Sequence, residues 1–339
     1  MLTLVVIIIA LALLFDFVNG MNDAANSIAT VVSTRVLTPR QAVAWAAFWN
    51  AAAMVFVGTA VAKTVSSVVP AAQADLSLVL AGLVGAIAWA HGCTMAGLPI
   101  SVSHSLMGGL VGAGWAAQGW GAINFAKLEP TLWFILLAPL IGLVVGAVLM
   151  TITYWVFRNS TPRRVDRLAR IGQLLSSAAF SLGHGSNDAQ KVMGIMTAAL
   201  VAGGVQQVGA SGVPDVQLWV VIAAHTAIGL GTLLGGWKVI QTMGSKLTKL
   251  RPEQGFCAEM AGSLVLMGTA VTGIPVSTTH SITGSIMGTG VVKRMRSVRW
   301  EVAKKILWAW VLTIPAAALV SAGTYWACQA LGLQSIAQR

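Results

Sequence analysis

Residues 97–105 read GLPISVSHS and residues 273–281 read GIPVSTTHS, so one short motif occurs twice in the chain. Most of its positions are identical, and others exchange similar side chains, such as Leu for Ile and Ser for Thr. A second pair, GMNDA at 20–24 and GSNDA at 185–189, precedes the first pair in each half. Two matches in the same order predict an internal duplication, and this duplication decides the fold.

The composition is that of a membrane protein. The 339 residues are 56% hydrophobic and only 9% charged, whereas soluble domains carry about 25% charged residues. Disordered, collagen-like and disulfide-scaffold classes are excluded by the same figures. The three cysteines, Cys93, Cys257 and Cys328, lie far apart in apolar stretches. They show no metal-ligand spacing, so we expect no structural metal and no cofactor.

Membrane helices need about 20 apolar residues, and ten stretches qualify in whole or in part. They are 2–34, 41–62, 76–94, 98–117, 131–157, 172–203, 216–237, 256–272, 276–292 and 306–333. With five stretches in each half, the second copy must enter the membrane from the opposite side, as in many secondary transporters. We therefore predict an all-α polytopic membrane protein with two inverted-topology repeats. The first repeat covers 1–157, a basic cytoplasmic linker covers 158–171, and the second repeat covers 172–339.

The basic residues predict the orientation. If each stretch crosses once and the N-terminus is outside, most of the 21 lysines and arginines fall on the cytoplasmic side. The positive-inside rule then places both termini outside, in a bacterial cytoplasmic (inner) membrane. The net charge of +11 is therefore a topology signal and requires no nucleic acid partner.

The two Asn-Asp motifs lie inside unusually long apolar stretches. At 1.5 Å per residue, 2–34 and 172–203 exceed a hydrocarbon core of about 30 Å. Such helices must tilt strongly, protrude or break, and the places to break are Asn19-Gly20 in the first and the glycines near Gly185 in the second. An ionised carboxylate at mid-membrane is costly, so the symmetric pair Asp23 and Asp188 indicates a site for a cation or proton. The alternative is that each Asp only caps a half-helix.

Three further polar residues accompany these motifs. Lys191 stands where the first half has Asn26. It could pair with Asp188, neutralise an anionic substrate, or extend its ammonium to the membrane surface. Gln190 is polar in the same stretch. Asp16 either joins the site or faces another polar cavity.

The Pro-Ser-His motifs predict helix N-termini, because proline suits the first helical turn. Pro99 and Pro275 would mark these ends, where free N–H groups, the helix dipole and neighbouring hydroxyls attract anions. The alternative is that the hydroxyls only bond within their own helices. The connections at 95–98 and 273–275 carry no charge, which favours re-entrant hairpins buried in the protein. His104 and His280 could titrate or hydrogen-bond in the site, or be structural.

The sequences NGMNDAANSIAT (19–30) and GHGSNDAQKVMG (183–194), with the two Pro-Ser-His motifs, resemble the signatures of the inorganic phosphate transporter (PiT) family. The resemblance covers both halves and is closest to the compact bacterial members. It implies a symporter of inorganic phosphate driven by H⁺ or Na⁺. The phosphate-binding residues carried over are Ser101, Ser103, Ser105, Ser277, Thr278, Thr279, Ser281, Gln190 and Lys191. The coupling-ion residues carried over are Asn22, Asp23, Asn26, Asn187 and Asp188.

We therefore expect a secondary active symporter, not an enzyme, that imports phosphate by alternating access. A sulfate or related oxyanion symporter is one alternative. An anion channel is another, although the paired acids speak against it. A membrane-embedded phosphoester enzyme is a third, although no nucleophile and base are paired in the sequence. The substrate is either free or metal-complexed phosphate, and the protein is either a monomer or a homo-oligomer.

Overall fold

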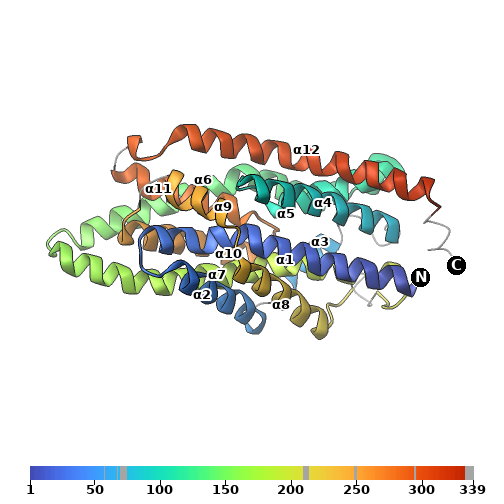
Figure 1. The fold of residues 1–339 in the computed structure, drawn as a ribbon, viewed down its shortest axis with the longest axis horizontal. Helices are drawn as coiled ribbons and strands as arrows, with labels where there is room; N and C mark the ends of the chain where they lie inside the picture. The colour runs from blue at the N-terminus through green and yellow to red at the C-terminus, as the bar shows by residue number, and fades with distance from the viewer. Residues whose placement is uncertain are drawn as a thin grey trace.

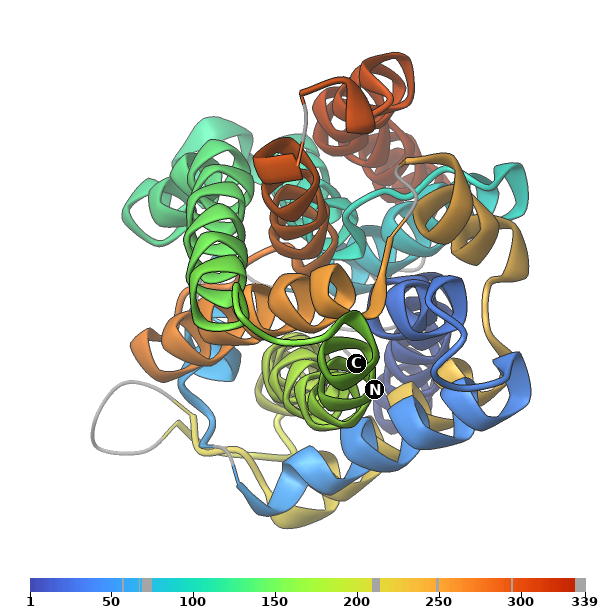
Figure 2. The same ribbon diagram turned by 90° about the vertical axis from the view of Figure 1, so that its left-hand side faces the viewer.

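The computed structural model describes residues 1–332 except 57, 67, 69–74, 209–213, 248–249 and 294, and only the backbone of 245, 246 and 296. The described part is an all-helical bundle without strands (Figures 1 and 2). Residues 333–339, the end of the predicted second repeat, lie outside the described residues. Lys249 and Arg294, two of the basic residues predicted to lie on the cytoplasmic side, also lie outside them.

The α-helices are α1 (Leu2–Ser33), α2 (Pro39–Ala52), α3 (Ala60–Ser66), α4 (Leu76–Ala96), α5 (Val102–Gln118), α6 (Phe125–Val156), α7 (Pro162–Ala202), α8 (Leu218–Leu234), α9 (Trp237–Gln241), α10 (Pro252–Thr272), α11 (Thr278–Lys293) and α12 (Trp300–Ala330). Short 3₁₀ turns at Ala53–Val55, Gly119–Ala122 and Met295–Ser297, and a π-helical turn at Thr242–Lys246, connect some of them.

Several of these helices are long and apolar enough to cross a membrane. Five qualify singly, and up to seven spans result if each of two bent helix pairs counts as one. Large apolar side chains on α6 and α12 face outward, with Leu136 63% and Leu319 74% exposed. Outward-facing apolar surface on this scale suits contact with lipid acyl chains. The prediction of an all-α multi-pass membrane protein is confirmed.

Two helical hairpins enter the bundle from opposite ends. The α4–α5 hairpin occupies the half that holds the N-terminus, and the α10–α11 hairpin occupies the other half (Figure 1). Each turns at a glycine with positive φ, Gly97 at 71° and Gly273 at 72°, a conformation that glycine adopts without strain. At 17 and 16 residues, α5 and α11 are shorter than a full span. The geometry therefore supports the re-entrant alternative for both hairpins.

Equivalent helices of the two halves pack in a reciprocal way. α1 packs on α8, and its counterpart α7 packs on α2. Likewise α5 packs on α12, and its counterpart α11 packs on α6. Each half therefore completes the core of the other. This exchange is what an internal duplication would produce, although the boundaries of the two repeats stay a prediction.

The predicted breaks in the two long helices are wrong. α1 is one helix of 32 residues and α7 is one helix of 41 residues. Their glycines allow close helix packing instead of a bend. A Cβ on Gly20 would lie 2.9 Å from the Thr232 nitrogen of α8, and a Cβ on Gly185 would lie 2.9 Å from the Asn50 Cα of α2.

Bent helix pairs, each either a broken span or a re-entrant loop, occur elsewhere in the chain. α2 and its 3₁₀ extension bend by 86° into α3, and α8 bends by 65° into the segment Trp237–Gly244. At the second bend Gly235 takes a φ of 63°, which most side chains would disfavour.

Most of the predicted linker 158–171 is helical. Proline occupies the first turn of α7, at Pro162, where its missing N–H costs nothing. Within these first turns the Arg170 Nε lies 2.8 Å from Asp166 Oδ2, an i,i+4 ion pair. The basic segment therefore extends α7 beyond the apolar part of the bundle.

Candidate ion and phosphate site

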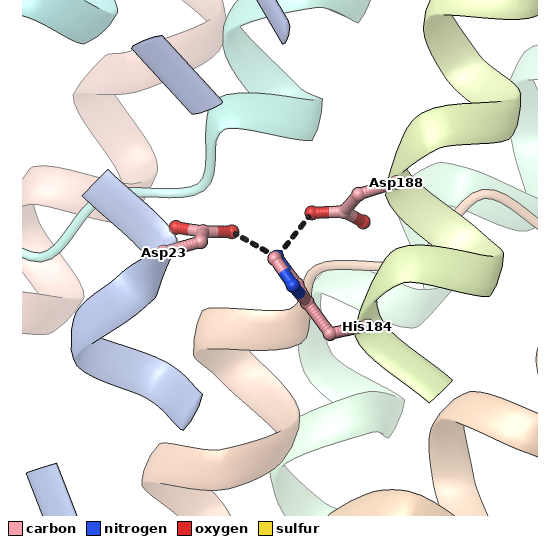
Figure 3. Close-up of side chains that lie close together, drawn as sticks. All are labelled: Asp23, His184 and Asp188. Atoms are coloured by element: carbon pink, nitrogen blue, oxygen red, sulfur yellow. Dashed lines mark ion pairs between the residues drawn. The ribbon is translucent and has the colours of Figure 1, made fainter. Parts of the chain in front are cut away.

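The predicted acidic residues meet where α1 and α7 lie side by side in the middle of the bundle. Asp23 comes from α1 and Asp188 from α7, and both are buried. The ring of His184, one turn before Asp188, points between the two carboxylates (Figure 3). Its Nε2 lies 3.2 Å from Asp188 Oδ2 and 3.6 Å from Asp23 Oδ2. The acids of the two repeated motifs therefore lie in one centre.

This centre has the composition of a cation site. One ligand atom each from Asp23, His184 and Asp188 lies within 4.8 Å of the others. Asn19, which stands where the second half has His184, donates from Nδ2 to Asp188 Oδ2 at 3.4 Å. Asn22 donates to Asp23 Oδ1 at 2.8 Å. Carboxylate and amide oxygens are ligands that hard cations accept.

Lys191 pairs with one of the two acids. Its ammonium bonds to Asp188 Oδ1 and also donates to Ser103 Oγ at 2.5 Å and to the Val276 carbonyl at 2.8 Å. The pairing alternative is therefore confirmed, and the membrane-surface alternative is wrong because the side chain is only 2% exposed. Asp23 has no lysine or arginine partner among the described ion pairs. The two acids thus differ in charge balance.

Hydroxyls from the hairpin tips complete the centre. Thr278 donates to Asp23 Oδ2 at 2.7 Å and to Asp188 Oδ2 at 3.5 Å, so one hydroxyl bridges both acids. Thr279 receives a hydrogen bond from Asn26 Nδ2 at 2.9 Å. Because Lys191 holds Ser103 in the same way, Asn26 and Lys191 make equivalent contacts despite their different chemistry.

Main-chain carbonyls also reach the centre, but from the hairpins. α1 and α7 are continuous helices and present no unwound carbonyls of their own there. Ile100 and Val276, at the tips before α5 and α11, present the carbonyls instead. Asn187 donates to another tip carbonyl, that of Ile274, at 3.5 Å.

Four of the predicted phosphate residues have partners within their own helix ends. Ser101 and Ser277 accept from the amides of His104 and His280 at 3.1 and 3.2 Å, as N-caps. Ser105 and Ser281 donate to carbonyls one turn back in their own helices, those of Ser101 and Ser277. The back-bonding alternative therefore describes this second pair.

Gln190 lies on the side of α7 that faces α3. Its Oε1 accepts from the amides of Val61 at 2.8 Å and Ala62 at 3.4 Å. It thus caps the first turn of α3.

The two motif histidines pack against each other. The rings of His104 and His280 meet edge to face with centroids 4.7 Å apart, and His280 stacks on Trp310 at 3.6 Å. Both imidazoles are buried one turn beyond the serine caps.

Sequence reasoning gave little weight to His184 and none to Asn19. The signal available was their position: each stands four residues before an Asp, at the same place in the two motifs. Side chains at i and i+4 share one helix face. The partner of His184 was not predictable, because Asn50 Oδ1, 3.0 Å from His184 Nδ1, comes from α2.

A buried centre of paired acids, a lysine and hydroxyls, enclosed by apolar helices and two facing hairpins, defines a multi-pass membrane transporter. Residues 19–321 match the family described as the phosphate transporter family. The chain belongs to this family, so it is a phosphate transporter and not an enzyme.

Relatives agree with this membership, and a solved structure has a similar fold. A "probable low-affinity inorganic phosphate transporter" of Rhizobium meliloti (strain 1021) is 49% identical over 325 residues, covering 96% of both chains. A protein of the same name in Bacillus subtilis (strain 168) is 40% identical, covering 96% of this chain and 97% of the relative. The solved structure of "the sodium-dependent phosphate transporter" has a TM-score of 0.85 at 24% identity, covering 96% of this chain and 99% of the other.

Proposed function

We propose that this transporter is a symporter that imports inorganic phosphate with a coupling cation, H⁺ or Na⁺, by alternating access. The observation that carries the proposal is the meeting of Asp23, Asp188 and Lys191 with the N-terminal ends of α5 and α11 at one buried point. Acids bind the cation, and a lysine with helix N-termini binds the anion. Cation and anion together offset each other's charge at mid-membrane.

The charge balance assigns different roles to the two acids. Lys191 already neutralises Asp188, so Asp23, with the hydroxyl oxygen of Thr278 beside it, is the primary cation ligand. Asn22 holds the Asp23 carboxylate by donating from Nδ2 to Oδ1. Asn26 donates to the hydroxyls of Thr278 and Thr279, and Asn187 donates to the carbonyl of Ile274, so both hold the tip of the α10–α11 hairpin beside the two acids. When phosphate enters, Lys191 exchanges its bond with Asp188 for one with a phosphate oxygen, and Asp188 then becomes available to the cation.

The phosphate contacts we propose are the hydroxyls of Ser103, Thr278 and Thr279, with Lys191. Ser101 and Ser277 hold the first turns of α5 and α11 in place. Ser105 and Ser281 lie one turn further into these helices. His104 and His280 support the hairpin tips by their mutual packing.

The fold supports an inverted-repeat mechanism in which the two halves rock around this site. The opposed hairpins and the reciprocal packing of equivalent helices favour it. We place the transporter in a bacterial inner membrane with both termini outside. The N-terminus of α1 and the C-terminal end of α12 lie at one end of the bundle (Figure 1), and the basic start of α7 lies at the other.

Uptake of radiolabelled phosphate into proteoliposomes tests the proposal. Accumulation against a phosphate gradient is expected under an imposed Na⁺ gradient or pH gradient, and the comparison identifies the cation. The solved structure with the similar fold is called "the sodium-dependent phosphate transporter", and this name favours the Na⁺ arm. Uptake with and without Mg²⁺ decides between free and metal-complexed phosphate. No accumulation under either gradient would refute the symporter.

Two variants test the acids. Asp23→Asn and Asp188→Asn should each abolish gradient-driven uptake. Asp166→Asn is the matched control, because Asp166 lies on the same helix as Asp188 with its side chain 49% exposed. Full uptake by either central variant would remove the role assigned to that residue.

A further inference from the structure

A cavity of about 330 Å³ lies between the tip of the α4–α5 hairpin, α9 and the first turns of α12. Its lining includes the tip residues Gly97 and Pro99 and the side chains of Lys238 and Lys305. The start of α12 lies at the end of the bundle opposite the N-terminus (Figure 1). The cavity therefore lies between the hairpin tip and that end, which is cytoplasmic in the orientation proposed above.

Positive charge without an acidic partner gathers in this cavity. Lys238 and Lys305 are both exposed, and none of the described ion pairs includes either of them. Lys238 donates from Nζ to the Met95 carbonyl at 2.9 Å, which holds its ammonium at the hairpin and leaves that group with two further donors. The lining contains no acid. Two cationic side chains in one concave space attract an anion.

A short stretch of chain separates the cavity from the central site. Pro99 lines the cavity, and the carbonyl of the next residue, Ile100, accepts from Thr279 of the central site at 2.9 Å. On the cavity side, the Thr242 hydroxyl donates to the Gly97 carbonyl at 3.0 Å. The hairpin tip is thus held from both sides. Movement of the tip away from Thr242 would join the central site to the cavity.

The tip of the other hairpin is held in the same way but without a lysine. Thr64 of α3 donates to the Gly273 carbonyl at 2.8 Å. Four residues before this threonine the chain has Ala60, whereas Lys238 stands four residues before Thr242. The cavity beside Ala60, of about 540 Å³, is lined by no charged residue. Holding a hairpin tip therefore requires the threonine but not the lysine.

The second lysine also departs from the internal repeat. At the 176-residue spacing of the Pro-Ser-His motifs, Lys305 of α12 corresponds to Glu129 of α6. Packing explains neither lysine, because both side chains are exposed. The positive-inside rule accounts for basic residues at this end of the bundle in general. It does not explain why two of them converge on one cavity at the hairpin tip.

We propose that Lys238 and Lys305 form a second phosphate site, which receives phosphate from the central site when the α4–α5 tip moves and releases it to the cytoplasm. This inference rests on the proposed symport and its orientation. The two ammonium groups donate to phosphate oxygens, in charge-assisted hydrogen bonds. Because both side chains are exposed, water and salt screen the site, and phosphate is held weakly enough to leave.

The test measures phosphate binding from each face separately. Right-side-out and inside-out membrane vesicles are prepared from bacterial cells that lack other phosphate transporters. Exchange of labelled for unlabelled inorganic phosphate is followed with equal cation on both sides. The half-saturating concentration of external phosphate then reports the extracellular face in the first preparation and the cytoplasmic face in the second.

We expect Lys305→Gln to raise the half-saturating concentration about fivefold at the cytoplasmic face, as for the loss of one exposed ionic contact. The value at the extracellular face should not change. Lys304→Gln is the matched control, since Lys304 is the exposed neighbour of Lys305 on α12 and does not line the cavity. It should leave both values unchanged.

Variants of Lys238 separate charge from structure. Lys238→Gln removes the charge but keeps a donor for the Met95 carbonyl, and it should show the same change at the cytoplasmic face as Lys305→Gln. Lys238→Arg keeps the charge and should restore the value of the unmodified protein. A purely structural role would not follow the charge in this way.

Three outcomes overturn the inference. The first is an unchanged cytoplasmic-face value in both glutamine variants. The second is an equal increase at both faces, which would mean that the central site is damaged. The third is an increase at the extracellular face alone. Failure of the unmodified protein to accumulate phosphate under either cation gradient refutes the symport instead, because exchange needs no gradient.

Discussion

The Thr279 hydroxyl donates to the main-chain carbonyl of Ile100 at 2.9 Å, and so joins the tips of the two hairpins. The equivalent residues make the same bond in the other direction, since Ser103 Oγ lies 3.3 Å from the Val276 carbonyl. This reciprocal pair holds the N-terminal ends of α5 and α11 against each other. Both hydroxyls also contact the central site, so the tips and the site are one unit.

Replacement of Ser103 should weaken phosphate binding. Ser103→Ala removes a hydroxyl held by Lys191, and a hydrogen bond to a charged group contributes about 1.5–3 kcal/mol. The KM for phosphate uptake should rise at least about tenfold, the factor that 1.4 kcal/mol represents. Ser105→Ala is the control, because Ser105 bonds within its own helix. Equal KM values for the two variants would contradict the assignment of Ser103.

Loss of the Lys191 ammonium should destabilise the protein. Lys191→Met leaves Asp188 buried without its lysine, and breaking a buried pair costs about 3–5 kcal/mol. Thermal unfolding in detergent should show a lower midpoint. The double variant Asp188→Asn with Lys191→Met should recover most of that loss, because residue 188 then carries no charge that needs the lysine.

Phosphate uptake by the double variant should not recover as its thermal stability does. The double variant should stay inactive in phosphate uptake, since both the anion contact and an acid of the cation site are gone. A double variant that is as unstable as Lys191→Met alone would show that the pair does not determine the stability of this centre.

The sequence predicted which residues form this site better than the course of the helices that carry them. The repeated motifs identified Asp23, Asp188 and Lys191, because an intramembrane charge at symmetric positions has few structural explanations. The sequence predicts a helix break at Gly20. Glycine in an apolar helix permits either a bend or close contact with another helix, and only the position of α8 decides between the two. The buried Glu259 of α10 was missed because the side chains that donate to it, Thr30, Gln173 and Ser176, come from two other helices.

The role of Gln190 can be tested by separating stability from affinity. Gln190→Met removes the oxygen that accepts from the amides of Val61 and Ala62. A buried amide left without a partner costs about 1–3 kcal/mol, so the thermal midpoint should fall. The KM for phosphate should not change if this side chain caps α3. A higher KM at an unchanged midpoint would instead place Gln190 in the phosphate site.

Close packing at the two motif glycines should limit what these positions accept. Gly20→Ala and Gly185→Ala put a methyl group against the backbone of α8 and α2, and overpacking costs about 1–3 kcal/mol. Gly92→Ala is the control within α4, where a Cβ meets no heavy atom within 4 Å. Because alanine favours helix over glycine by up to about 1 kcal/mol, this variant should keep or raise the thermal midpoint. A midpoint for Gly20→Ala equal to that of Gly92→Ala would mean that α1 and α8 can separate without cost, and that the unbroken α1 needs another explanation.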